Sequence, residues 1–156
     1  MKSDVCVFNH IELYGSKVSS IDLSKIRNVN MLDLSYSSIS SLDVSKMKKL
    51  ENLKIGYNTS MTSLDLTNSS VKYLACQNNL ISQLVVSGSE NLELLDFSSN
   101  TSLSASSIDV ILSHIDRPTH KATIGQFYAV SRTTDSDSAY NSLISKGWTI
   151  SIGQVL

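Results

Sequence analysis

An apolar position recurs every 21 residues along most of the chain, and this period limits the folds that the sequence can adopt. A second apolar column lies two residues after each of these anchor positions, and a third lies three residues before it. The anchors are Ile11, Leu32, Leu53, Leu74 and Leu95; the second column is Leu13, Leu34, Ile55, Cys76 and Phe97; the third is Phe8, Val29, Leu50, Val71 and Leu92. One unit is too small to bury its own apolar residues, so the period predicts five units stacked in series around a shared core.

Each unit predicts one short strand. Two apolar residues separated by one other residue alternate with period two, as in a strand with one buried face. The segments between strands are rich in Ser, Asn and Asp, which leaves room only for parallel strands stacked by tight coils. Five residues after each anchor lies a polar side chain that we expect to hydrogen-bond the backbone of neighbouring units. These ladder residues are Ser16, Ser37, Asn58, Asn79 and Asn100.

The repeat pattern resembles that of a known family. Residues 71–87, VKYLACQNNLISQLVVS, and residues 30–45, NMLDLSYSSISSLDVS, are similar to the short bacterial leucine-rich repeats of the internalin type. The resemblance covers residues 8–103 and implies an α/β solenoid, with a parallel sheet on one face and coils on the other. It also implies that Cys76 is a small buried core residue. The first two units depart from the family by having serine in place of the ladder asparagine, and the fourth has Val85 where Asp22, Asp43 and Asp65 stand in the others.

After residue 103 the period ends, and the remaining sequence predicts a C-terminal cap of helix, strand, helix and strand. Ile108, Ile111, Leu112 and Ile115 have helical spacing. We expect this helix to begin with Ser106 and Asp109 as a capping pair and to end near Asp116. Residues 122–127, ATIGQF, alternate like a strand. Such a segment would cover the open end of the stacked units.

The rest of the cap is expected to hold a second helix and a final strand. Residues 135–137 would cap the helix, which would close at Lys146 and Gly147, and Trp148 would begin the strand. This segment resembles the caps of leucine-rich-repeat proteins of bacteriophages and gut bacteria. We expect residues 1–156 to form a single domain, with an N-terminal cap and five repeats over 1–103 and the C-terminal cap over 104–156.

Composition and charge argue against several kinds of partner. A formal net charge of −1 with a pI near 6.3 gives no overall attraction to nucleic acid or to an anionic membrane. No apolar run has the length of a signal peptide core or the roughly 18 residues that cross a bilayer. Cys6 and Cys76 lack the spacing of a disulfide framework or a zinc site. We therefore expect no cofactor, metal, nucleic-acid or membrane partner, and a location in a virion or the bacterial cytoplasm.

We expect no enzymatic activity. The three histidines form no predicted arrangement with a nucleophile and a carboxylate, and serines are so frequent that an apparent triad would be a coincidence. Function should instead lie on the exposed face of the strands, because the core residues are committed to packing. The residues expected to bind a partner there are Tyr14, Tyr36, Asn52, Lys54, Tyr57 and Tyr73.

Tyr36 and Tyr57 occupy the same position in successive units, so we expect them to lie one strand spacing apart, about 4.8 Å. Paired tyrosines supply large, stiff contact areas of the kind found at binding hot spots. The alternative is that tyrosine simply suits a half-exposed sheet. A second predicted site is a basic edge on the loops, formed by Lys25, Arg27, Lys46, Lys48 and Lys49. It would hold an anionic partner or a symmetry-related subunit, or else be a solvated loop edge.

Two functional hypotheses follow. The favoured one is a non-enzymatic protein-protein interaction or structural module that belongs to a phage virion, as a decoration, tail or fibre component in contact with other virion proteins. It depends on the phage-like cap and on the expectation that the chain has no anchor, export signal or further domain. The alternative is a free bacterial recognition module that binds a protein or a glycan on its concave sheet.

Overall fold

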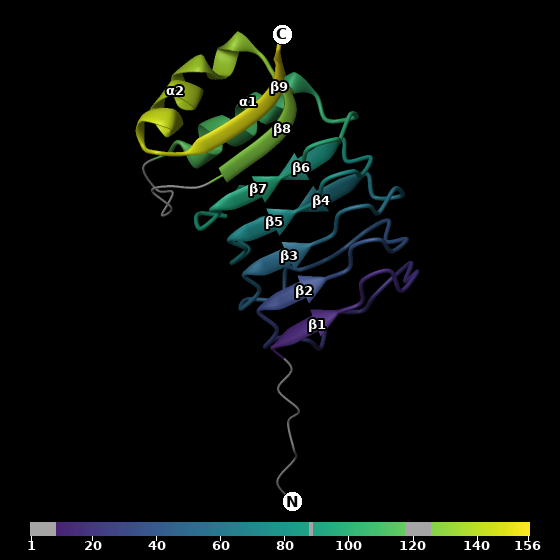
Figure 1. Cartoon of the computed structure of the whole chain (residues 1–156). Helices are drawn as coiled ribbons and strands as arrows, with labels where there is room; N and C mark the ends of the chain where they lie inside the picture. Colours follow the sequence, from purple (N-terminus) through teal and green to yellow (C-terminus); the bar gives the residue numbers. More distant parts are fainter. Residues whose placement is uncertain (1–8, 88, 118–125) are drawn as a thin grey trace, which may run out of the picture.

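Parallel strands stacked along one axis form the framework of the protein. The computed structural model describes residues 9–87, 89–117 and 126–156. Within these residues, seven strands form one parallel sheet in the order β1–β2–β3–β5–β7–β8–β9, an α/β fold (Figure 1). The strands are β1 (His10–Glu12), β2 (Met31–Asp33), β3 (Asn52–Lys54), β5 (Tyr73–Ala75), β7 (Leu94–Asp96), β8 (Gln126–Arg132) and β9 (Thr149–Val155).

The strand register follows the 21-residue period. Leu53 on β3 pairs with Leu32 on β2 and with Leu74 on β5, and the remaining anchors continue this column in both directions. The anchors from Leu32 to Leu95 are fully buried, whereas Ile11 is half-buried at the start of the sheet. The predicted parallel strands and their shared core are therefore confirmed. Phe8, the first member of the third column, lies outside the described residues.

A second, smaller sheet lies where the sequence predicts only coil. Strands β4 (Ser63–Asp65) and β6 (Gln83–Val85) pair in parallel, with Leu64 opposite Leu84. The physical reason is the same alternation that marks the larger sheet, because each segment places one apolar residue between two exposed ones. The third unit therefore contributes β3 to the large sheet and β4 to the small one, and the fourth unit contributes β5 and β6 in the same way.

The asparagine ladder is present as predicted. The amide group of buried Asn79 donates to the carbonyl of Cys76 in its own unit at 2.9 Å and to that of Ile55 in the preceding unit at 3.0 Å. Its oxygen accepts from the backbone N–H of Asn58 at 2.6 Å. One side chain thus satisfies three buried backbone groups. The serine version is weaker, since the Ser37 hydroxyl reaches the Leu13 carbonyl only at 3.4 Å.

The C-terminal segment continues the same sheet and core. Helix α1 (Ala105–Ile115) packs against β8, and helix α2 (Asp137–Ser145) packs against β9 (Figure 1). Phe127 on β8 lies opposite Leu95 of the last repeat, and Ile150 on β9 lies opposite Phe127. The apolar residues that α1 buries are Ile108, Ile111, Leu112 and Ile115. No described helix is long and apolar enough to span a membrane.

The predicted start of α1 is wrong. Ser104, two residues earlier than expected, caps the helix by accepting from the Ser107 N–H at 3.2 Å. The Asp109 carboxylate does not cap the first turn of α1, because it is buried inside the cap and bonded to residues of a later segment. It accepts from the backbone N–H and the hydroxyl of Thr133, at 3.0 and 2.6 Å, and from the Ser136 hydroxyl at 2.6 Å. The predicted end at Asp116 is confirmed.

Two other boundaries in the cap also differ from the prediction. The first cap strand begins at Gln126 and runs to Arg132, later than predicted, while residues 122–125 lie outside the described residues. Residues 134–136 form a short 3₁₀ helix, η1 (Thr134–Ser136), whose start is capped by the Thr133 hydroxyl rather than by an aspartate. The predicted C-terminal end of α2 is confirmed, since Lys146 is the C-cap residue and Gly147 follows it with a φ of 92°.

Candidate binding surface

A column of left-handed backbone conformations marks the point where the chain leaves each strand. The residues in this column have positive φ angles between 57° and 66°: Gly15, Tyr36, Tyr57, Asn78 and Ser99. Glycine and asparagine adopt such angles readily, whereas a bulky residue there is strained. Tyrosine is thus placed twice at a position where its backbone conformation costs about 1–2 kcal/mol.

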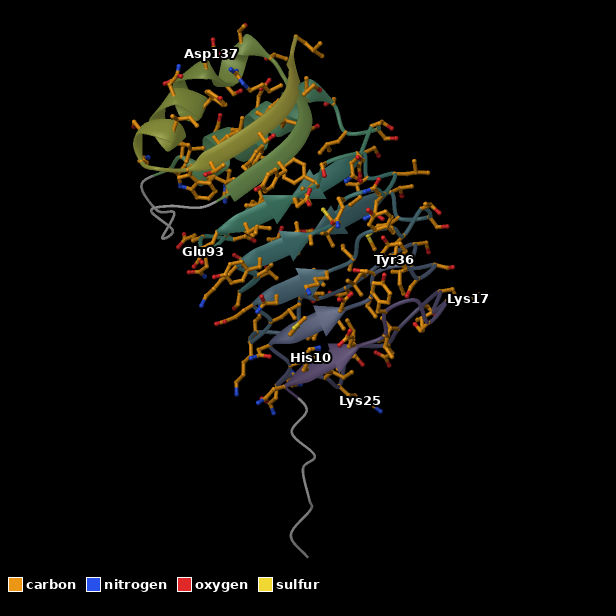
Figure 2. All side chains as sticks on the ribbon, in the orientation of Figure 1. His10, Lys17, Lys25, Tyr36, Glu93 and Asp137 are labelled. Carbon is orange, nitrogen blue, oxygen red and sulfur yellow. The ribbon has the colours of Figure 1, made fainter. Side chains whose placement is uncertain are left out.

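Three tyrosines stack along this edge, and we call Tyr14, Tyr36 and Tyr57 the tyrosine stack. The rings of Tyr36 and Tyr57 are nearly parallel, at 11°, with centroids 4.1 Å apart. The Tyr14 ring lies 5.0 Å from Tyr36 and is tilted by 52°. Tyr14, Tyr36 and Tyr57 remain 59%, 45% and 38% exposed, so stacking leaves much of each ring available to a partner. Figure 2 shows Tyr36 at the exit ends of the strands.

The hydroxyl groups of the stack interact with one another. Hydrogen bonding with the Tyr57 side chain is the main cause that raises the pKa of the Tyr36 phenol. Like an ordinary tyrosine, Tyr36 has a protonated phenol at neutral pH that can donate a hydrogen bond to a ligand. The sequence predicts that Tyr36 and Tyr57 are neighbours. It does not predict that Tyr14, one position earlier in its unit, joins them.

The other predicted strand-face residues form a separate group. Asn52, Lys54 and Tyr73 line a hollow of about 290 Å³ on the exposed face of β3 and β5, together with Leu74, Ala75 and Leu94. The Tyr73 hydroxyl donates to the Glu93 carboxylate at 2.7 Å, which raises the pKa of Tyr73. Glu93 lies at the entry ends of the strands, opposite to Tyr36 (Figure 2). Tyr73 is therefore not part of the tyrosine stack.

Two residues beside this surface have roles that the sequence does not indicate. Asp33 lies between the core residues Leu32 and Leu34, at a strand position that should face outward, yet it is buried. Its carboxylate accepts the Ser35 N–H at 2.9 Å and lies 3.9 Å from the Lys54 ammonium. Gly56 lies beneath the Gln77 side chain, whose Cδ would be 2.9 Å from a Cβ at this position. The other units have Tyr14, Ser35, Gln77 and Ser98 at this repeat position. A glycine among these larger residues could have indicated the close approach from the sequence.

The predicted basic edge is only partly brought together. All five of its residues are exposed, but only Lys48 and Lys49 line a polar hollow of about 450 Å³. We call it the entry hollow, and it is formed by Asn30, Lys48, Lys49, Glu51, Ser70, Lys72 and Asn91. Lys25, Arg27 and Lys46 do not line it. Sequence reasoning missed Lys72, because this residue directly precedes strand β5 and does not share a repeat position with the lysines and arginine of the predicted basic edge.

The thiol of Cys76 is shielded from reaction inside the core. Cys76 is fully buried, and desolvation, with a smaller effect of the Asp96 charge, raises the pKa of its thiol above the ordinary value. A thiol held protonated in an apolar core is a poor nucleophile and a poor metal ligand. Among the residues that the structure describes, no three His, Cys, Asp or Glu side chains are grouped closely enough to hold a metal ion.

Known proteins provide no guide to the function. Comparisons with protein-family models, with curated proteins and with solved structures find no match for this chain. The surface described above is therefore the basis on which the function has to be argued.

Proposed function

We propose that the chain is a leucine-rich-repeat solenoid that works as a non-enzymatic binding module, with the tyrosine stack as its main contact site. Support for the solenoid comes from the 21-residue strand register and from the buried asparagines that bridge successive units. Support for binding comes chiefly from one observation: two exposed tyrosines occupy left-handed positions that other units fill with glycine, asparagine or serine.

The backbone conformation weakens the alternative explanation of these tyrosines. A tyrosine that merely suits a half-exposed sheet should lie within a strand, where the pleated backbone favours aromatic residues. Tyr36 and Tyr57 instead lie after β2 and β3, and each carries a backbone cost. Stacking contributes about 0.5–1.5 kcal/mol and roughly offsets that cost without exceeding it. Stability alone gives little reason for tyrosine here, whereas an exposed aromatic contact surface does.

The ligand class is a protein or a glycan, because stacked phenols offer both an apolar contact area and hydroxyl donors. A role in a phage virion, in contact with other virion proteins, has the support of the cap sequence alone. It predicts that the protein sediments with particles through density-gradient purification. Recovery only as a free chain from a lysate that contains intact particles would contradict that role.

The test of the binding module uses the double variant Tyr36→Asn/Tyr57→Asn. Asparagine adopts the left-handed conformation readily, so we expect the free energy of unfolding to change by less than about 1 kcal/mol, because relief of strain offsets lost stacking. Urea denaturation followed by circular dichroism measures this. The wild-type protein and the variant are then compared on a glycan array and against a displayed peptide library.

We expect the wild-type protein to select a defined glycan or peptide class and the double variant to lose it by at least about tenfold, or 1.4 kcal/mol. The matched control is Ser99→Asn, which changes the same left-handed position in a unit outside the stack. Equal binding by the wild-type protein and the double variant would rule out the tyrosine stack as the contact site.

A further inference from the structure

The entry hollow lies at the opposite ends of the strands from the tyrosine stack and has a different chemistry. Its residues come from the segments that lead into β2, β3, β5 and β7. The backbone there is already satisfied by the neighbouring unit, since the Asn30 carbonyl accepts from the Glu51 N–H at 2.9 Å and the Glu51 carbonyl accepts from the Lys72 N–H at 2.8 Å. The side chains are therefore the groups that remain for a ligand.

The charges around the hollow are unbalanced. Three lysines and one glutamate line it, so three positive charges and one negative charge leave +2, in a chain whose net charge is −1. Lys72 is neutralised by Glu51, with 3.0 Å between the ammonium and carboxylate atoms, and this contact raises the pKa of Lys72. The excess charge therefore belongs to Lys48 and Lys49, which form no ion pair with any residue that the structure describes.

One of the two unpaired lysines is also held in place. The Lys48 ammonium donates to the Asn68 carbonyl at 3.4 Å, and the Ser70 hydroxyl donates to the Lys48 carbonyl at 2.8 Å. These contacts link the lysine to the next unit. Lys48 and Lys49 are consecutive in the chain and both line the hollow, so an anion bound there is attracted by both positive charges.

From this arrangement we infer that the entry hollow binds a doubly charged tetrahedral oxyanion, a sulfate or phosphate group, between Lys48 and Lys49. Two unpaired ammonium groups match two negative charges, and the amides of Asn30 and Asn91 are the further donors that line the hollow. No aromatic residue lines it, so a nucleobase would find no stacking surface. Its volume exceeds that of a single oxyanion, which leaves room for the molecule that carries the group.

The experiment titrates ¹⁵N-labelled protein with sodium sulfate, and in a second arm with sodium phosphate, against sodium chloride at equal ionic strength. We expect saturable shifts of the backbone amide signals at residues 47–51 and 69–73 with sulfate or phosphate, and only small linear shifts with chloride. Sodium acetate is a further arm. Saturation by acetate at the same concentration as by sulfate would overturn the assignment to a doubly charged anion.

The double variant Lys48→Gln/Lys49→Gln is expected to weaken saturable binding by at least tenfold. Its matched control is Lys25→Gln/Arg27→Gln, which removes the same two charges from the same edge but outside the hollow, and which should bind as the wild-type protein does. Both variants change exposed residues, and the dispersion of their spectra reports that they are folded. Equal loss in both variants, or no saturable binding in the wild-type protein, would overturn the inference.

The inference does not depend on the tyrosine stack. The probes are inorganic ions that need no aromatic contact, and Tyr36 and Tyr57 are unchanged in every arm. An oxyanion site can therefore be present when the tyrosine variants show no loss of glycan or peptide binding, and the reverse also holds. The two proposals fail separately.

Discussion

At the scale of single residues, the position in the unit decides the backbone conformation before the side chain does. The N–H groups of Gly15, Tyr36, Tyr57 and Asn78 each donate to the carbonyl of the next unit, at 2.9–3.0 Å. These bonds hold all of them at nearly the same positive φ angle, whatever the residue type. Tyr36 and Tyr57 could be placed in one column from the spacing. Their left-handed conformation could not, because tyrosine itself argues against it.

A second residue-scale feature is an aspartate that recurs in the first three units, 11 or 12 residues after the anchor. Asp22, Asp43 and Asp65 each accept the backbone N–H two residues later, at 2.7–2.9 Å. For Asp43, hydrogen bonding from the Ser45 side chain and then from its backbone N–H lowers the pKa below the ordinary value of 3.8. Val85 replaces this aspartate in the fourth unit and cannot make the bond.

Asp43 therefore predicts a pH dependence of stability. Because its pKa is lower in the folded protein than in the unfolded chain, the ionised carboxylate stabilises the folded state above about pH 4, and this contribution is lost as the pH falls below the ordinary value of 3.8. Asp43→Asn keeps an acceptor but binds no proton. We expect the stability advantage of the wild-type protein over this variant to be smaller at about pH 3 than at about pH 6.

Urea denaturation of both proteins at the two pH values measures this difference. Lys46→Gln is a useful control, since the Lys46 charge is only the last and smallest cause of the Asp43 shift. A stability gap between the wild-type protein and Asp43→Asn that is the same at both pH values would show that the carboxylate is not stabilised by folding.

At the scale of elements, each strand is followed by a buried bend of the chain, which we call the corner. The ladder side chain makes a corner possible because it hydrogen-bonds the buried backbone groups there. The described corners in the third to fifth units have asparagine, which satisfies both carbonyl and N–H groups, while the second has Ser37. A hydroxyl is too short and has too few donors to do the same. The ladder could be predicted from the column alone, because a buried corner has backbone groups that no neighbouring strand pairs and that a side chain must satisfy.

The ladder predicts that Asn79→Ala is much more destabilising than Ser37→Ala. Asn79→Ala leaves the buried N–H of Asn58 without a partner and removes one of the two amide donors to each of the carbonyls of Ile55 and Cys76, which should together cost at least about 2 kcal/mol. Ser37→Ala removes two long contacts, to the Leu13 carbonyl and to the Ser16 hydroxyl, and should cost less than about 1 kcal/mol. The free energies of unfolding in urea test both. Equal costs would mean that asparagine and serine have the same role in the ladder.

The cap elements show where local signals fail. The spacing of Ser106 and Asp109 is a helix-start pattern, yet Asp109 binds Thr133 and Ser136, which lie 24 and 27 residues further along the chain. Buried carboxylates take the strongest donors that the fold brings to them. A local motif cannot reveal a competitor that reaches it only through tertiary folding.

At the scale of the whole molecule, the cap and the repeats form one sheet with a continuous apolar interior. The ring of Phe127 meets that of Phe97 edge to face, with centroids 4.9 Å apart, at the point where the last repeat gives way to the cap. Phe127 is fully buried, and its strand continues the anchor column of the repeats. The cap therefore covers the end of the core with a buried apolar residue that occupies the same register position as the anchors of the repeats.

Phe127→Ala should lower the free energy of unfolding by about 3–5 kcal/mol, because it leaves a cavity at this junction. Hydrogen exchange should then show the largest loss of protection in β7, β8 and α1, and a smaller loss in β2, since each unit contacts only its neighbours. Ile144→Ala, on the exposed side of α2, is the control and should cost less than about 1 kcal/mol. Uniform loss along all strands would instead show that the molecule unfolds as one unit.

The sequence by itself determined the strand period, the parallel register, the buried columns and the asparagine ladder, because a 21-residue repeat makes every unit face the same backbone and packing requirements. The leucine-rich-repeat assignment stays a proposal that agrees with those features. Only the tertiary structure decided which surface residues meet. Tyr14 joins Tyr36, Tyr73 turns to Glu93, and Lys72 pairs with Glu51 and shares a hollow with Lys48. Exposed side chains have no packing constraint that repeats along the chain, so their contacts depend on distances that exist only once the units are stacked.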